Sequence, residues 1–132
     1  MIKMAIVENK NLGDLLKYEA DKNYCREVVT VAAGQNLKLG TIVGIKTATD
    51  EVKSVYLPTG AQNEVLDGSE TAVGVLLEDV DATDGVKKSL MIARDAIVAS
   101  GAVVFPNGAT ANQKKKIKKD LEARGLVIRQ SA

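Results

Sequence analysis

From Glu27 onward, short runs of apolar residues alternate with glycine, asparagine, aspartate and proline. The runs are rich in valine and isoleucine, whose branched side chains favour strands. Each run is too short for a stable helix, so the pattern predicts a mainly β domain, a small barrel or sandwich. We expect strands near Glu27–Val31, Thr41–Thr47, Lys53–Leu57, Thr71–Leu77, Ser89–Arg94 and Ala96–Ala99, with Val127 and Ile128 in a closing strand.

The length and aromatic content limit the core. A chain of 132 residues fits one domain with one modest core. Because the chain has one Phe and no Trp, that core must be built from small aliphatic side chains. Between Pro58 and Glu70, a proline, two glycines and several acids predict a surface loop.

One segment near the carboxyl end has clear helix signals. Thr110 is a good N-cap, and Gln113 stands three residues later as its capping-box partner. Gly125 follows where a helix should stop. Ile117 and Leu121 form a narrow apolar pair, so this short helix is expected to rest lightly on the β domain.

The first 23 residues differ from the rest of the chain. Charged residues are interleaved with Leu12, Leu15, Leu16 and Tyr18, and no turn residues define a hairpin. We expect an extended N-terminal arm over residues 1–23 and a β-rich domain over residues 24–132. One helical turn would place the three leucines on one face, but so short a helix is unstable alone. The arm therefore packs on its own domain or orders on a partner surface.

The chain offers little for catalysis. It has no histidine, the commonest general base and metal ligand at neutral pH, and Cys25 is its only cysteine. Cys25 has no partner for an internal disulfide, which suits a reducing compartment, and we expect it to act as a small buried apolar residue. We predict no enzyme, no catalytic residue and no cofactor.

The acidic segment LLEDVDATDG invites comparison with a calcium loop. An EF-hand register starting at Asp79 would place the required glycine at Asp84 and the bidentate acid at Leu90. Both positions are therefore unsuitable, and we expect no metal site. Asp84 and Gly85 are instead predicted to form a turn.

Lysines are concentrated in the predicted helix. Residues 110–132 carry seven Lys or Arg against two acids, whereas residues 1–109 carry eleven against fifteen. No aromatic residue stands among the lysines to stack on bases, so we expect a solvated helix face and no nucleic-acid site. No stretch approaches the roughly 18 apolar residues of a membrane span, and we expect no cleaved export signal.

Several segments, in a fixed order, resemble one family of proteins. They are REVVTVAAGQNLKLGTIVG at Arg26–Gly44, GVLLEDVDAT at Gly74–Thr83, ARDAIV at Ala93–Val98, a late proline, a short helix and GLVIR at Gly125–Arg129. The chain resembles the head decoration proteins of lambda-like tailed bacteriophages from about Leu12 to Arg129. The specificity of the resemblance lies in the order and spacing of these segments.

The resemblance implies a β-tulip-type domain and a structural role on the outer surface of a virion, after synthesis in the bacterial host cytoplasm. It implies homotrimers at three-fold or quasi-three-fold positions of the expanded head, where they stabilise the shell against internal DNA pressure. The partner would be the major capsid protein. The arm would contact it through Leu12, Leu15, Leu16 and Tyr18.

A second interpretation stays open. AAGQNLKLGTIVG also resembles the hairpin of small lipoyl-like carrier or binding modules, which display a modified lysine on a tight turn. The segments around Lys46 and Lys53 do not reproduce the residues that such a hairpin needs. A mass shift on a lysine would favour the carrier, and a trimer would favour decoration.

Overall fold

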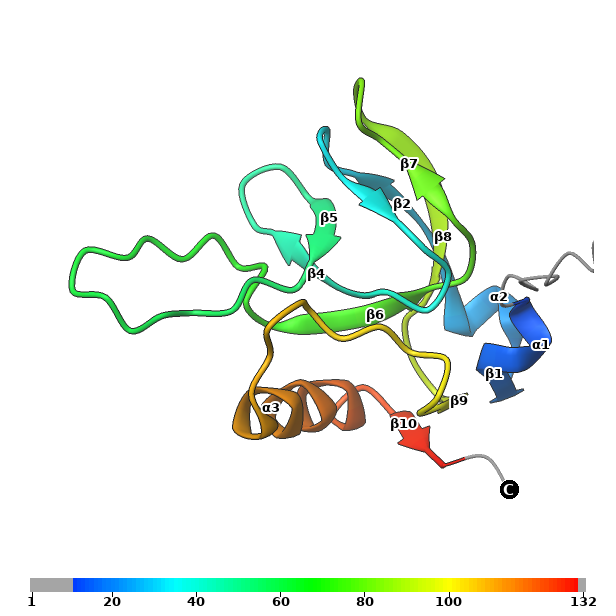
Figure 1. The fold of residues 1–132 in the computed structure, drawn as a ribbon. Helices are drawn as coiled ribbons and strands as arrows, with labels where there is room; N and C mark the ends of the chain where they lie inside the picture. The colour runs from blue at the N-terminus through cyan, green and yellow to red at the C-terminus, as the bar shows by residue number, and fades with distance from the viewer. Residues whose placement is uncertain (1–10, 131–132) are drawn as a thin grey trace, which may run out of the picture.

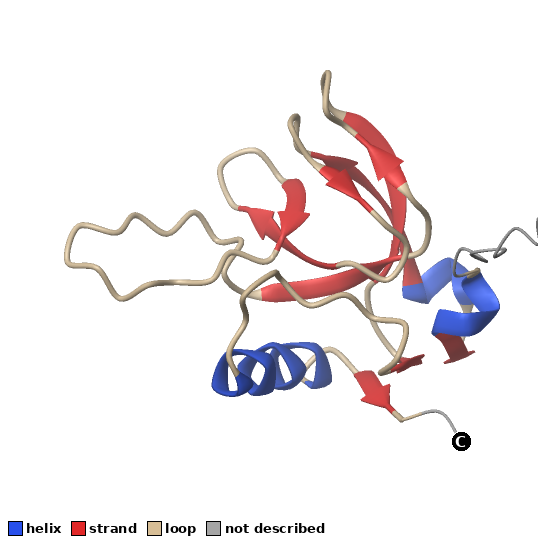
Figure 2. Cartoon of the chain, in the orientation of Figure 1, coloured by secondary structure: helices blue, strands red, loops and turns tan. Residues whose placement is uncertain are grey.

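The structure, a computed structural model, describes residues 11–130 and contains ten strands and three helices in that range (Figures 1 and 2). The helices are α1 (Leu12–Leu15), α2 (Lys22–Cys25) and α3 (Ala111–Glu122). The strands are β1 (Leu16–Glu19), β2 (Arg26–Val31), β3 (Asn36–Leu37), β4 (Ile42–Lys46), β5 (Glu51–Ser54), β6 (Ala72–Leu76), β7 (Val80–Asp81), β8 (Lys87–Ile92), β9 (Ala96–Ala99) and β10 (Leu126–Arg129).

Five of the strands close into a ring in the order β2-β5-β4-β6-β8. Neighbouring strands in the ring are antiparallel, except that β2 and β5 are parallel. A smaller sheet has the order β1-β9-β10, and β3 pairs with β7. The predicted mainly β fold with one short C-terminal helix is confirmed.

The expected strands are present, with shifts at their ends. β9 has the predicted bounds, whereas β5 lies earlier than the predicted Lys53–Leu57. β5 begins early because Glu51 and Val52 pair with both β2 and β4. In the ring, β5 lies between β2 and β4.

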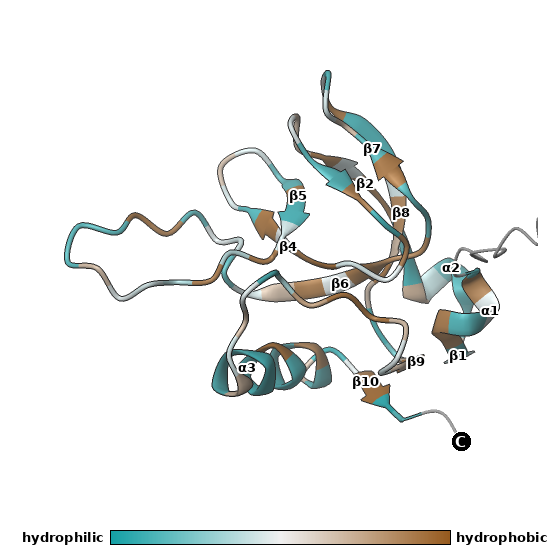
Figure 3. Cartoon of the chain, in the orientation of Figure 1, coloured by the Kyte–Doolittle hydropathy of each residue, from teal (hydrophilic) through white to brown (hydrophobic). Residues whose placement is uncertain are grey.

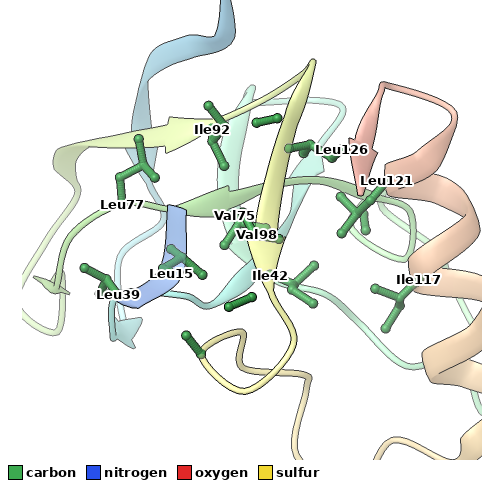
Figure 4. Packing of buried hydrophobic residues seen from close by; sticks show 14 of the residues in the cluster. Leu15, Leu39, Ile42, Val75, Leu77, Ile92, Val98, Ile117, Leu121 and Leu126 are labelled. Carbon is green, nitrogen blue, oxygen red and sulfur yellow. The ribbon is translucent and has the colours of Figure 1, made fainter. Parts of the chain in front are cut away.

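Buried side chains form two clusters, one on each face of the central strands. Successive residues alternate between them: Ile42 and Val75 belong to one cluster, and Val43 and Leu76 to the other. β6 is buried along its whole length and is largely brown in Figure 3. Figure 4 shows the first cluster, where strand residues meet Ile117, Leu121 and Leu126. A strand buried on both faces reads as a continuous apolar run, as β6 does.

Helix α3 has the predicted caps and contacts. The Thr110 hydroxyl accepts the N–H of Gln113 at 3.2 Å, and the Gln113 side chain accepts the N–H of Thr110 at 2.8 Å. Ile117 and Leu121 are the buried residues of the helix. Gly125 has a φ of 80°, the left-handed conformation that glycine adopts most readily after a helix.

Residues 11–25 form two short helices and a strand rather than an extended arm. Leu15 is fully buried, and β1 pairs with β9. The leucines bury apolar surface that the ring and β9 leave open, which stabilises helices too short to form alone. Met1–Lys10, the remainder of the expected arm, lies outside the described residues.

Gly44 allows a close approach of two backbones inside the ring. A Cβ at this position would overlap the carbonyl group of Ser69. The end of the long loop can therefore pack directly on β4 only because residue 44 has no side chain.

Candidate functional site

The segment that carries the four expected contact residues is anchored to the domain. Asn11 caps α1 and shares a reciprocal capping box with Asp14. Leu15 is 0% exposed, and Leu12 and Leu16 pack against the same core cluster. The three leucines thus stabilise the domain itself. Tyr18 differs, because it is 56% exposed.

An ion pair fixes the end of β1 to the start of β2. Arg26 Nη2 lies 2.6 Å from Glu19 Oε1, and Arg26 Nε lies 2.9 Å from Glu19 Oε2. The hydrogen bond to Glu19 raises the pKa of Arg26, and burial opposes that shift. Both side chains are about one-fifth exposed, at 22% and 19%, so water screens this two-point contact only in part.

An apolar row crosses the outer face of the small sheet. In the register of the strands, Tyr18 lies opposite Ile97, and Ile97 lies opposite Val127. These three side chains line an open groove of about 290 Å³ together with Ala20, Asp95, Ala96 and Gly125. Below we call this surface the sheet groove. The groove lies on the small sheet, whose edge strand β1 is the first strand of the described chain.

A polar pocket adjoins the sheet groove and shares Asp95 and Gly125 with it. Arg94 lies over the ring of Tyr24, 5.0 Å from its centroid, and also binds the Tyr24 carbonyl and the Glu27 carboxylate. Arg124 completes the lining of the pocket. The rim of the groove on this side therefore carries the ring of Tyr24, the ion-paired Arg94, the exposed Arg124 and the shared Asp95.

The predicted surface loop, between β5 and β6, projects from the end of the molecule opposite to the small sheet (Figure 1). Its apolar residues are unusually open: Val65 is 87% exposed and Leu66 is 49% exposed. Glu64 organises the loop by accepting bonds from the Thr59 N–H at 2.9 Å and the Gly60 N–H at 3.1 Å. We call residues 58–70 the projecting loop.

The Glu64 carboxylate also accepts the hydroxyl of Tyr56. This bond is the main reason that the pKa of Glu64 lies below its ordinary value, and the N–H of Thr59 lowers it further. The same bond raises the pKa of Tyr56. The loop conformation thus depends on an ionised carboxylate.

The acidic segment after β6 serves local structure. Asp79 accepts the N–H of Leu39 at 2.7 Å, and Asp81 accepts the N–H of Thr83 at 3.0 Å. The Thr83 hydroxyl also donates to Asp81. This bond, followed by the bond from the Thr83 N–H, lowers the pKa of Asp81. Among residues 11–130, no three histidine, cysteine, aspartate or glutamate side chains gather to hold a metal ion.

The lysines of α3 are mostly exposed, as the sequence predicted. Lys116 pairs with Asp120 at 2.9 Å, and Lys114 lies over the ring of Phe105. Cys25 is fully buried, with its sulfur 3.6 Å from the carbonyl of Asp95. In the described part of the chain, no helix has the length and apolar character needed to cross a membrane.

The sequence named Tyr18 as a contact residue, which stays a prediction, and did not point to the residues that surround it. Ile97 and Val127 share a row only because β9 and β10 are parallel neighbours, which no local pattern reveals. Val65 and Leu66 could have been found, because two adjacent aliphatic residues inside a polar loop are a local signal of a contact surface.

Comparison with known proteins identifies a family for this chain. No curated protein gives a significant match. Residues 5–126 match the family described as bacteriophage lambda head decoration protein D. The match covers nearly the whole chain, including the ring, the strands β1 and β9 of the small sheet, the projecting loop and α3. The chain belongs to the bacteriophage lambda head decoration protein family, and its role is decoration of a phage capsid.

Proposed function

We propose that this chain binds the expanded phage head as homotrimers at three-fold and quasi-three-fold positions and stabilises the shell against internal DNA pressure. The observation that carries the proposal is the family match over residues 5–126. Binding by surface complementarity needs no catalytic chemistry, and the chain's lack of histidine suits such a role.

The proposed contact with the major capsid protein begins at the N-terminal end of the chain. The stretch MIKMAIV supplies apolar side chains that can bury against an exposed strand edge, with main-chain hydrogen bonds adding affinity. Leu12, Leu15 and Leu16 hold the root of this segment on the domain. Tyr18 remains exposed and can contact the capsid directly.

A trimer can bind the capsid tightly even if each of its arms binds weakly. Once one arm of a trimer is bound, the other two bind at a high effective concentration, and total affinity rises without new kinds of contact. A protein that binds the expanded lattice and not the unexpanded one lowers the free energy of the expanded state by mass action. The decorated shell therefore resists rupture.

No feature of the β4–β5 hairpin supports the alternative carrier function. Residues 47–50 at its tip are Thr, Ala, Thr and Asp, and the adjacent Lys46 lies at the end of β4 rather than on the turn. The family match favours decoration.

The stabilising role is tested on DNA-filled heads that lack decoration protein. Such heads are heated with and without the purified chain, and DNA release is followed by nuclease sensitivity. We expect the release temperature to rise with added protein until the sites are saturated. An unchanged release temperature at saturation would overturn the stabilising role.

The arm is tested in the full-length chain with the double substitution Ile6→Asp and Val7→Asp. We expect at least tenfold weaker binding to expanded heads, as for truncation of a central anchor. Val86→Asp is the control, because Val86 is exposed, at 52%, and precedes β8, outside the N-terminal segment of the sequence. Equal binding by both variants would refute the arm contact.

A further inference from the structure

We propose that the trimer is built head to tail, with Val65 and Leu66 on the projecting loop of one copy inserted into the sheet groove of the next copy. This inference rests on the proposed function, because it assigns the two surfaces that join the copies of the proposed homotrimer.

The projecting loop is suited to present these two side chains. Val65 and Leu66 are exposed, at 87% and 49%, on a loop that extends well beyond the ring (Figure 1). Glu64 holds one side of the loop through the N–H groups of Thr59 and Gly60. At its base, the Thr47 N–H donates to the Asp67 carbonyl at 2.8 Å. A loop that is already ordered loses less entropy when it binds.

The sheet groove provides a concave apolar surface. Tyr18, Ile97 and Val127 line it from three adjacent strands, so its shape is set by main-chain pairing. Its strands β1, β9 and β10 lie at the opposite end of the molecule from the projecting loop (Figure 1). One chain can therefore use both surfaces at once, with a different neighbour at each.

The charges of the two surfaces favour a contact of loop with groove over a contact of loop with loop. The projecting loop carries Glu64, Asp67 and Glu70 and no lysine or arginine. Arg124 is exposed in the pocket that adjoins the groove, beside Gly125. Among the described residues, Asp95 is the one charged residue that lines the groove itself. Loop against loop would bring the three acids of each copy together, whereas loop against groove lets these acids pair with Arg124 at the rim.

The same asymmetry fits a closed trimer. A contact between two different surfaces of one protein repeats around an axis, and it closes into a ring when the rotation allows. Each copy then donates one loop and accepts one, and all apolar side chains of both surfaces are covered.

The first experiment measures assembly by light scattering over a dilution series. Val65→Ser with Leu66→Ser should raise the subunit concentration at half-assembly by about tenfold or more, as loss of interface anchors does. Val86→Ser is the control, because Val86 is an exposed valine outside both surfaces. The inference is overturned if the double variant and the control assemble like the unaltered chain.

The second experiment introduces cysteines at Val65 and Val127, together or in separate chains, and adds a mild copper oxidant. Chains with both cysteines should form covalent trimers, free in solution or bound to heads. Separate single variants should cross-link only when mixed. The unaltered chain is the control, because Cys25 is fully buried. Cross-linking of the Val65→Cys variant with itself, or none in any sample, would refute the loop-to-groove contact.

These outcomes are separable from those of the proposed function. If the variants leave assembly unchanged while the chain still binds expanded heads, decoration stands and the assignment of surfaces fails. If the cross-linked trimer forms but no form of the chain binds heads, the surfaces stand and the proposed function fails.

Discussion

The Glu19 carboxylate and the Arg26 guanidinium meet at two points, 2.6 and 2.9 Å apart, and so join the N-terminal strand to the ring. We expect Arg26→Ala to lower the free energy of unfolding by about 1 kcal/mol, because the fork is only partly screened by water. Urea denaturation measures the change. Lys116→Ala, which removes an exposed pair within α3, serves as the control and should change little.

Leu15 tests whether residues 11–25 belong to the domain. Leu15→Ala leaves a cavity in a fully buried site, and we expect it to lower the free energy of unfolding by about 3 kcal/mol. Val86→Ala, at an exposed position before β8, is the control and should have an effect within about 0.5 kcal/mol. Equal stability of the two variants would mean that Leu15 is not a core residue.

Gly44 should tolerate no side chain. Gly44→Ala places a methyl group against the Ser69 carbonyl, and we expect a loss of about 1–3 kcal/mol in thermal or urea unfolding. Gly101→Ala is the matched control, since no atom lies within 4 Å of the added methyl group there. A Gly44→Ala variant as stable as its control would show that the loop does not pack on β4.

Ser89 places a buried hydroxyl on β8, and within residues 11–130 it has no hydrogen-bond partner. We expect Ser89→Ala to keep or raise the free energy of unfolding, by up to about 1 kcal/mol, because it removes an unsatisfied polar group. Ser69→Ala should be destabilising by comparison, since the Ser69 hydroxyl donates to Asp67. Marked destabilisation by Ser89→Ala would reveal a partner for this hydroxyl.

The conformation of the projecting loop should depend on pH. The pKa of Glu64 is lowered in the folded chain, so the loop bonds are complete above its ordinary value near 4.5 and are lost as the pH falls through the lowered value. Amide shifts of Thr59 and Gly60, followed by NMR, should report this transition. Glu64→Gln should abolish it, and an unchanged titration in that variant would assign the transition to another group.

Local signals predicted local structure well. The capping box of Thr110 and Gln113 and the stop at Gly125 are present, because each depends on a few neighbouring residues. Cys25 is buried, as its residue type predicted. The branched apolar runs likewise marked the ring strands. These features require no knowledge of which segments meet.

Long-range pairing could not be predicted in the same way. β5 lies between β2 and β4, and β10 runs parallel to β9, because of contacts between residues far apart in the sequence. The burial of Leu15 also depends on residues far away in the sequence. The spacing of the leucines fits packing on a partner or on the domain, and the structure places Leu15 in the core cluster of the domain. The sheet groove depends on the pairing of β1 and β10 with β9.

The most direct test of capsid decoration is co-sedimentation of the purified chain with undecorated expanded heads, with unexpanded heads as the control. The account predicts binding to expanded heads alone, saturating near one chain per capsid subunit. Equal binding to both lattices, or binding to neither, would contradict it.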